Sequence, residues 1–185
     1  MSMIHQIGGS EITLRPPDAD DAAAIATFAA AMPPHDLLFL ARDIRRPKVV
    51  SAWLDAQERG QINSSIALVD GAIVGTVAIF ADPLSWSPHV LDIRLLVAPA
   101  WRGKGLGRKL LDLAVNDAIL RGATKVTARM TPDQAGAITL FEECGFRAEA
   151  MLHGQLRDAA GGLHDLAVLA LDPARAAARR EAFGD

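Results

Sequence analysis

Apolar residues recur along this chain in short runs and alternations that predict β-strands. Residues 11–16 (EITLRP) alternate polar and apolar positions, as a half-buried strand does. Two later apolar runs are joined by Asp70 and Gly71, a pair that readily takes the positive φ angles of a tight hairpin turn. Another run, VLDIRLLV, is apolar except for Asp92 and Arg94, which indicates a buried strand with two polar interruptions. The predicted strands are residues 11–16, 65–69, 72–80, 90–97, 125–130, 146–157 and 163–171.

Helical periodicity and end signals predict the other elements. The acidic run from Asp18 to Asp21 precedes an alanine-rich stretch, and carboxylates in a first turn suit the positive end of a helix dipole. Gly122 stands where it can cap a longer amphipathic helix. The predicted helices are residues 18–32, 48–59, 134–144 and the stretch from the glycine-rich turn to residue 121. Residues 35–46 receive no assignment, and the tail from residue 173 is either a short helix or frayed.

The order of these elements predicts an α/β fold. Hairpins come first and β-α-β units later, which favours a mixed, mostly antiparallel sheet of six or seven strands with about four helices on its two faces. There is no internal repeat and no linker-like stretch, so we expect residues 1–185 to form a single domain.

Composition narrows the class of protein. Half of the 185 residues are apolar, enough for one compact core, and the net charge of −3 argues against wholesale nucleic-acid or membrane binding. No apolar stretch approaches the ~20 residues of a membrane span, and the first ten residues do not read as a signal peptide. The lone cysteine, Cys144, excludes a disulfide framework and a cysteine metal cluster, so we expect a cytoplasmic protein. The sequence contains no tyrosine, so no mechanism can use one.

The most informative stretch is residues 97–111, VAPAWRGKGLGRKLL. A strand ends, a turn carries three glycines at alternate positions, and a helix begins. Such a turn lets successive backbone N–H groups point into one concavity beside the positive end of the helix. Basic side chains add charge, and the whole suits a pyrophosphate. The predicted anion-binding residues are Arg102, Gly103, Lys104, Gly105, Leu106, Gly107 and Arg108.

Other glycine-rich phosphate loops do not match this turn. A P-loop needs G-x-x-x-x-G-K-[ST], and here Lys109 is followed by Leu110. A dinucleotide fingerprint needs G-x-G-x-x-G, whereas these glycines are spaced G-x-G-x-G. A turn that merely packs a helix on the sheet is the remaining alternative.

The RGKGLG sequence after a strand and V-x-P resembles the acyl-CoA signature of the GNAT acetyltransferase superfamily, [QR]-x-x-G-x-[GA]. Residues 137–146 (AITLFEECGF) resemble that family's A-x-x-L-Y-x-x-x-G-F helix. The resemblance covers about residues 11–171. It implies the GNAT fold and an N-acetyltransferase that moves an acetyl group from acetyl-CoA to a primary amine. Both substrates would bind together, and neither a covalent enzyme intermediate nor a metal is needed.

The resemblance also implies residue roles. The turn would bind the cofactor's pyrophosphate, and the backbone of Leu95, Leu96 and Val97 on a bulged strand would bind its pantetheine arm. The Leu95 amide would polarise the thioester carbonyl. Gln134 stands where many members have a pantetheine-binding asparagine, and Phe141 where many have a tyrosine that protonates the departing thiolate. That proton would come from water or a histidine, or the thiolate would leave unaided.

Three polar residues are further candidates. Asp92 is either the general base, since a mostly buried strand would raise the pKa of its carboxyl, or the partner of a cation such as Arg94. Arg94 either binds a substrate carboxylate or forms that structural ion pair. Asp36 is a candidate substrate contact. Four histidines are candidates for acid–base work, and none has metal-ligand spacing: His35, His89, His153 and His164.

The acceptor stays open at this stage. A small-molecule amine, such as an amino acid, is favoured over a protein N-terminus, and residues 33–59 and 82–88 would decide. The resemblance allows a homodimer, since dimers are common in the family. A non-catalytic acyl-CoA-binding sensor is the competing class, because the usual tyrosine is absent.

Overall fold

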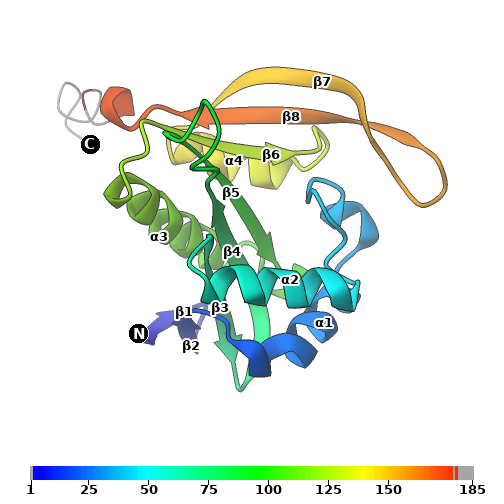
Figure 1. Cartoon of the computed structure of the whole chain (residues 1–185). Helices are drawn as coiled ribbons and strands as arrows, with labels where there is room; N and C mark the ends of the chain where they lie inside the picture. The colour runs from blue at the N-terminus through cyan, green and yellow to red at the C-terminus, as the bar shows by residue number, and fades with distance from the viewer. Residues whose placement is uncertain (1, 177, 179–185) are drawn as a thin grey trace.

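The computed structural model, which describes residues 2–176 and 178, contains one mixed sheet (Figure 1). Its order is β1-β2-β3-β4-β5-β6-β8-β7, and β5 and β6 are its parallel pair, the other neighbours being antiparallel. The strands are β1 (Met3–Ile7), β2 (Ser10–Arg15), β3 (Ile62–Val69), β4 (Ala72–Phe80), β5 (Val90–Val97), β6 (Lys125–Met130), β7 (Arg147–Arg157) and β8 (Leu163–Leu171).

Helices cover both faces of the sheet (Figure 1). Helices α1 (Ala22–Ala31) and α2 (Pro47–Glu58) bury Phe28 and Leu54 in one apolar cluster. Helices α3 (Leu106–Leu120) and α4 (Ala135–Glu143) bury Leu110 and Phe141 in a second, larger cluster on the opposite face. The predicted α/β class with a mixed, helix-covered sheet is therefore confirmed.

The strand count differs slightly from the prediction, because β1 was not foreseen. Gly8 and Gly9 turn the chain with φ of 59° and 81°, so residues 3–7 fold back on β2 as a hairpin and make eight strands. The unassigned segment before α2 contains a short 3-10 helix (Pro34–Leu37) and then irregular chain. In the tail, residues 173–176 are helical, while 177 and 179–185 lie outside the described residues.

Two predicted chain reversals have the expected geometry. Asp70 and Gly71 take φ of 48° and 80°, the positive values that a two-residue hairpin loop of the I′ type needs. At the end of α3, Gly122 takes φ of 85°, and its N–H donates to the Ile119 carbonyl at 2.9 Å. The next N–H, of Ala123, donates to the Ala118 carbonyl at 3.0 Å, which completes a Schellman motif.

No helix among the described residues has both the length and the hydropathy that a membrane span requires.

One partly buried ion pair connects the sheet to α1. Arg15 at the end of β2 donates from its two Nη atoms to the Asp21 carboxylate at 2.6 and 2.7 Å. Asp21 also accepts from the Asp18 N–H at 2.9 Å in a capping box ahead of α1. The hydrogen bond from Arg15 is the main reason why the pKa of the Asp21 carboxyl lies below its ordinary value.

This pair predicts a pH-dependent contribution to stability. Replacing Asp21 by Asn should lower the free energy of unfolding by about 1–3 kcal/mol near pH 7, because the half-buried Arg15 guanidinium loses a charged partner. A depressed pKa stabilises the fold above the unfolded-state pKa of about 4, and that stabilisation disappears as the pH falls below it. Denaturant titrations of both proteins at pH 7 and pH 3 should show the difference shrinking at the lower pH. A pH-independent difference would contradict this origin.

Candidate active site

The sheet opens between its two parallel strands. Strand β5 pairs with β6 from Val90 to Ile93, opposite Lys125 to Ala128, and the pairing then ends. Both strands continue, β5 to Val97 and β6 to Met130, so their ends separate. On its other edge β5 remains paired with β4 as far as Val97. The end of β5 is thus held by one neighbour and open toward the other.

Alternation of the hydrogen bonds tells which backbone groups face the opening. The Ala98 N–H donates to the Val74 carbonyl at 2.9 Å, continuing the ladder with β4. In an antiparallel pair every second residue bonds to the neighbour, so Arg94 and Leu96 face β4 as well. The backbone groups of Leu95 and Val97 therefore point into the gap beside β6. These are two of the three residues that the sequence predicted for pantetheine binding.

The glycine turn lies at the open end of β5. Gly103 and Gly105 take φ of 68° and 90°, and Gly105 is the N-cap of α3. The N–H groups of Leu106, Gly107 and Arg108 open the helix and have no intrahelical acceptor. A Cβ atom on Gly107 would lie 3.0 Å from the Leu140 Cδ2 methyl, so a larger residue there would require the Leu140 side chain to shift.

The basic side chains of the turn differ in their partners. Arg102 donates from Nη2 to Asp36 Oδ2 at 2.6 Å and from Nε to the Val97 carbonyl at 3.1 Å. Lys104 lies over the Trp101 ring, 4.9 Å from its centroid. The contact to Arg102 places Asp36 beside the turn, and its role as a substrate contact stays a prediction.

The opening and the turn border one cavity of about 710 Å³, the splay cavity. Such a volume is within the range of small-molecule and cofactor sites. Its lining residues include His35, Asp36, Ile93, Leu95, Leu96, Val97, Arg102, Gly103, Gly105, Gly107, Arg108, Arg129, Met130, Asp133, Gln134, Leu140 and Phe141. Nearly all of the residues predicted to bind the cofactor are thereby brought together.

Both departures from the family pattern lie in this cavity. Gln134, the N-cap of α4, uses its Oε1 to accept from the Thr131 N–H at 3.1 Å. Phe141 is buried and meets Phe146 edge to face, with ring centroids 5.0 Å apart. The ring is therefore part of the core as well as of the cavity wall.

Of the four candidate histidines, His35 lines the splay cavity. Its Nε2 lies 2.7 Å from Asp133 Oδ2. Thr131 and, to a smaller extent, His35 hydrogen-bond Asp133 and hold the pKa of its carboxyl below the usual range. His153 and His164 are paired with Asp165 and Asp158, and His89 is exposed. No group of three or more His, Cys, Asp or Glu residues in the described part of the chain is arranged to hold a metal ion.

Asp92 is surrounded by cations. Its Oδ2 lies 3.1 Å from Arg94 Nε, and its Oδ1 lies 3.6 Å from Arg129 Nε. The Thr127 hydroxyl donates to Oδ1 at 3.0 Å. This geometry favours the ion-pair alternative, because each carboxylate oxygen already accepts one hydrogen bond and two guanidinium groups lie nearby. The general-base role stays a prediction.

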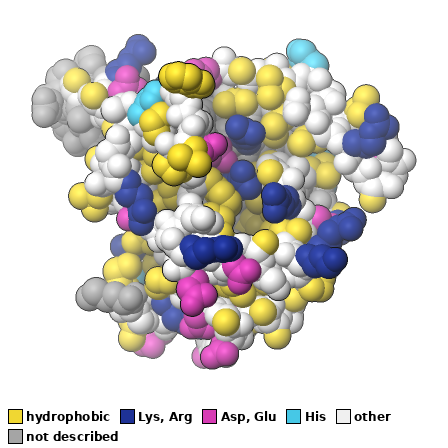
Figure 2. All heavy atoms as spheres, viewed as in Figure 1, with side chains coloured by type: hydrophobic (Ala, Val, Ile, Leu, Met, Phe, Trp, Pro, Cys, Tyr) yellow, Lys and Arg dark blue, Asp and Glu magenta, His cyan; other side chains and the backbone are white. Residues whose placement is uncertain are grey.

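A second cavity, of about 510 Å³, lies on the other face of β4 and β5 beneath α2, and we call it the arginine cavity. Figure 2 shows basic side chains gathered around an apolar hollow on this side of the molecule. Its lining residues include Leu40, Arg42, Ile44, Ala52, Trp53, Ala56, Arg59, Thr76, Ala78, Phe80, Arg94 and Leu96. Leu96 lines both cavities, so they adjoin across β5.

Comparison with known proteins now gives the family. Residues 24–146, about two thirds of the chain, match the model of the "Acetyltransferase (GNAT) family". The chain belongs to the GNAT acetyltransferase family. This confirms the resemblance found in the glycine turn and in the α4 sequence.

Individual relatives of this GNAT chain are distant. An L-methionine sulfoximine/L-methionine sulfone acetyltransferase of Salmonella typhimurium is 29% identical over 103 residues, which span 55% of this chain and 60% of that protein. The crystal structure of an N-acetyltransferase from Staphylococcus aureus Mu50 superposes with a TM-score of 0.77 and 18% identity. The match covers 88% of this chain and 99% of that chain. The structure of yncA, a putative acetyltransferase from Salmonella typhimurium with its cofactor acetyl-CoA, superposes with a TM-score of 0.74 and 24% identity. The match covers 88% of this chain and 94% of that chain. The two structures share the GNAT fold.

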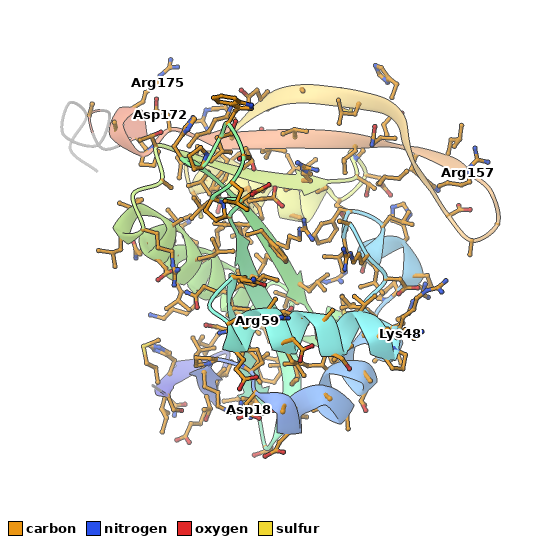
Figure 3. The ribbon with its side chains drawn as sticks, viewed as in Figure 1. Asp18, Lys48, Arg59, Arg157, Asp172 and Arg175 are labelled. Carbon is orange, nitrogen blue, oxygen red and sulfur yellow. The ribbon has the colours of Figure 1, made fainter. Side chains whose placement is uncertain are left out.

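Sequence reasoning did not single out Arg42 and Arg59, which line the arginine cavity. Arg42 lies in the segment that received no assignment, and Arg59 follows the end of α2 (Figure 3). Each looks like an ordinary surface arginine in the sequence. Packing of α2 against β3 and α1 brings them to the same cavity as Arg94.

Replacement of Asp92 by Asn tests its role directly. Since Asp92 holds Arg94, we expect the acceptor KM to rise while kcat and its pH dependence change little. A general base would instead give a loss of kcat of roughly 10²–10⁴-fold and remove the acidic limb of the pH–rate profile. Steady-state kinetics from pH 5 to 9 distinguish the two, with Asp165→Asn, which lines neither cavity, as a control.

Proposed function

We propose that this GNAT protein transfers the acetyl group of acetyl-CoA to the primary amine of a small molecule, by direct attack in a ternary complex. The observation that carries the proposal is the pair of cavities that adjoin at Leu96. One has an anion-binding turn and open backbone groups, and the other is walled by apolar and basic side chains. Two substrates could therefore meet at β5 without a covalent enzyme intermediate.

The splay cavity suits an acyl-CoA. The free N–H groups of Leu106, Gly107 and Arg108 at the positive end of α3 would bind the pyrophosphate. The backbone N–H and carbonyl of Leu95 and the N–H of Val97 would bond the amides of the pantetheine arm, as an added strand would, while the Val97 carbonyl already accepts from Arg102. The Gln134 side chain lines the same cavity and offers an amide donor.

Bound acetyl-CoA supplies the thioester whose acetyl group is transferred. The Leu95 N–H, which points into the gap, would donate to the thioester carbonyl and stabilise negative charge on its oxygen as the amine attacks. Attack of the amine would form the C–N bond, departure of the CoA thiolate would break the C–S bond, and the proton lost by the nitrogen would pass to water. Phe141 cannot donate a proton, so the thiolate leaves unaided or is protonated by water or by His35.

Release of free CoA thiol during incubation of acetyl-CoA with a panel of primary amines tests this proposal. We expect turnover with small amines, with a single acetylated product detected by mass spectrometry. Binding of acetyl-CoA without turnover across the panel would favour a sensor over an enzyme.

The turn can be tested with one substitution and a matched control. Gly105→Val should abolish acetyl-CoA binding, because φ of 90° excludes a β-branched residue and the N–H groups at the start of α3 must then move. Gly122→Val imposes similar strain, at φ of 85°, beyond the other end of the same helix. Calorimetry should therefore show lost affinity in the first variant and retained affinity in the second. Equal affinity in both would refute the assignment of this turn.

A substitution at Phe141 tests whether protonation of the departing thiolate limits the rate. Phe141→Tyr places a hydroxyl at the family's usual position on a nearly isosteric ring. We expect turnover to change less than about tenfold, or about 1.4 kcal/mol in the barrier, because a thiolate is a competent leaving group. A larger increase would show that protonation limits the rate. Phe146→Tyr, in the neighbouring ring that lines neither cavity, measures the stability cost of burying the hydroxyl.

A further inference from the structure

The arginine cavity has an unusual balance of charge. Three of its lining residues are arginines, Arg42, Arg59 and Arg94, and no aspartate or glutamate of the described chain lines it. The remaining wall is mostly apolar and includes Trp53 of α2 and Phe80 of β4. A cavity with basic and apolar walls and no carboxylate is complementary to an anion that carries an apolar group.

Arg94 is held in a defined orientation. Its guanidinium carbon lies 3.9 Å from the centroid of the Phe80 ring, and its Nε bonds to Asp92 Oδ2 at 3.1 Å. These contacts occupy one face of the Arg94 guanidinium and one of its N–H groups. The two Nη atoms have no hydrogen-bond partner among the described residues, so they are available to form a fork with a carboxylate.

The other two arginines line the same cavity with most of their donors unused. Arg59, labelled in Figure 3, bonds through its Nε to the Asp55 carbonyl at 3.0 Å. Arg42 makes no ion pair with any described residue. Both side chains are exposed, so they add a positive field and a second layer of anion contacts at the entrance.

From this arrangement we propose that the acceptor is an anionic amine, namely an α-amino acid or a close analogue with an apolar side chain. This inference rests on the proposed function. The carboxylate binds Arg94 with support from Arg42 and Arg59, and the side chain packs against Trp53. The amine then faces Leu96, which borders the splay cavity and lies about 7 Å along β5 from Arg94.

Like-charge repulsion makes this cavity selective. A diamine or polyamine brings positive charge beside Arg42 and Arg59, which form no ion pair with a described residue, and beside Arg94, whose charge Asp92 already balances. An amino acid neutralises one guanidinium, and the remaining positive field favours the neutral form of its amine, which is the form that attacks a thioester.

The test compares sets of three ligands that differ only in the carboxylate. L-leucine, L-leucinamide and 3-methylbutylamine form one such set, and L-methionine, L-methioninamide and 3-(methylthio)propylamine form another. Calorimetry on the protein saturated with CoA gives binding, and thiol release with acetyl-CoA gives kcat/KM. In each set we expect the acid to exceed the amide and the amine by about 10- to 100-fold in both measurements.

Arginine variants identify the cause of that preference. Arg42→Gln, Arg59→Gln and Arg94→Gln should each weaken binding of the acid and leave the amide almost unchanged, with the largest effect at Arg94. Arg46→Gln is the matched control, because Arg46 lies in the same segment as Arg42 but lines neither cavity. The two exposed positions, Arg42 and Arg59, keep the test valid even if Arg94→Gln fails to fold.

The possible outcomes separate this inference from the proposed function. Preferential binding of the acids without turnover would support the anionic ligand and refute the transferase. Turnover of amines and amides as fast as acids would support the transferase and refute the anionic acceptor. Absence of acid binding, or equal effects of the arginine variants and of Arg46→Gln, would also overturn the inference.

Discussion

Loss of strand pairing after Ile93 and Ala128 is the constraint on which the rest of this site depends. If β5 and β6 stayed paired to their ends, the backbone groups of Leu95 and Val97 would be used in the sheet and the splay cavity would not exist. Because β5 keeps its full ladder with β4, the open edge stays ordered, and its donors and acceptors point in a set direction. The same strand then leads directly into the glycine turn, so the anion site and the open edge share one origin.

Charge is distributed unevenly around this opening. Arg94 and Arg129 lie on neighbouring strands, and two guanidinium groups so placed would repel each other without a carboxylate between them. Asp92 stands between them and accepts from Arg94, while Thr127 bonds to its second oxygen. A carboxylate on an apolar strand, such as Asp92, can thus serve to orient a neighbouring guanidinium such as that of Arg94. This also explains why its sequence position alone could not distinguish a base from an ion pair.

Turns and helix ends that depend on neighbouring residues were predicted correctly from the sequence. Features that depend on the packing of distant segments were not. The glycine turn, the Asp70–Gly71 hairpin and the Gly122 cap each follow from residues within a few positions of one another. Strand β1 was missed because five residues flanked by polar positions give a weak alternation, although Gly8 and Gly9 mark its turn. The arginine cavity could not be predicted, since Arg42, Arg59 and Arg94 come from a loop, a helix end and a strand.

The missing tyrosine and the engaged Asp92 leave few side chains for proton transfer, and the charge of the arginine cavity bears on that shortage. An attacking amine must be neutral, and every nearby guanidinium raises the free energy of its ammonium form. On the proposed function, the acceptor would thus reach β5 already deprotonated or would lose its proton easily to water. Backbone groups would then carry the remaining task, because the Leu95 N–H needs no titratable group to stabilise an oxyanion. On the proposed function, a site built in this way would depend on the position of β5 and on the arginines, and less on a dedicated acid or base.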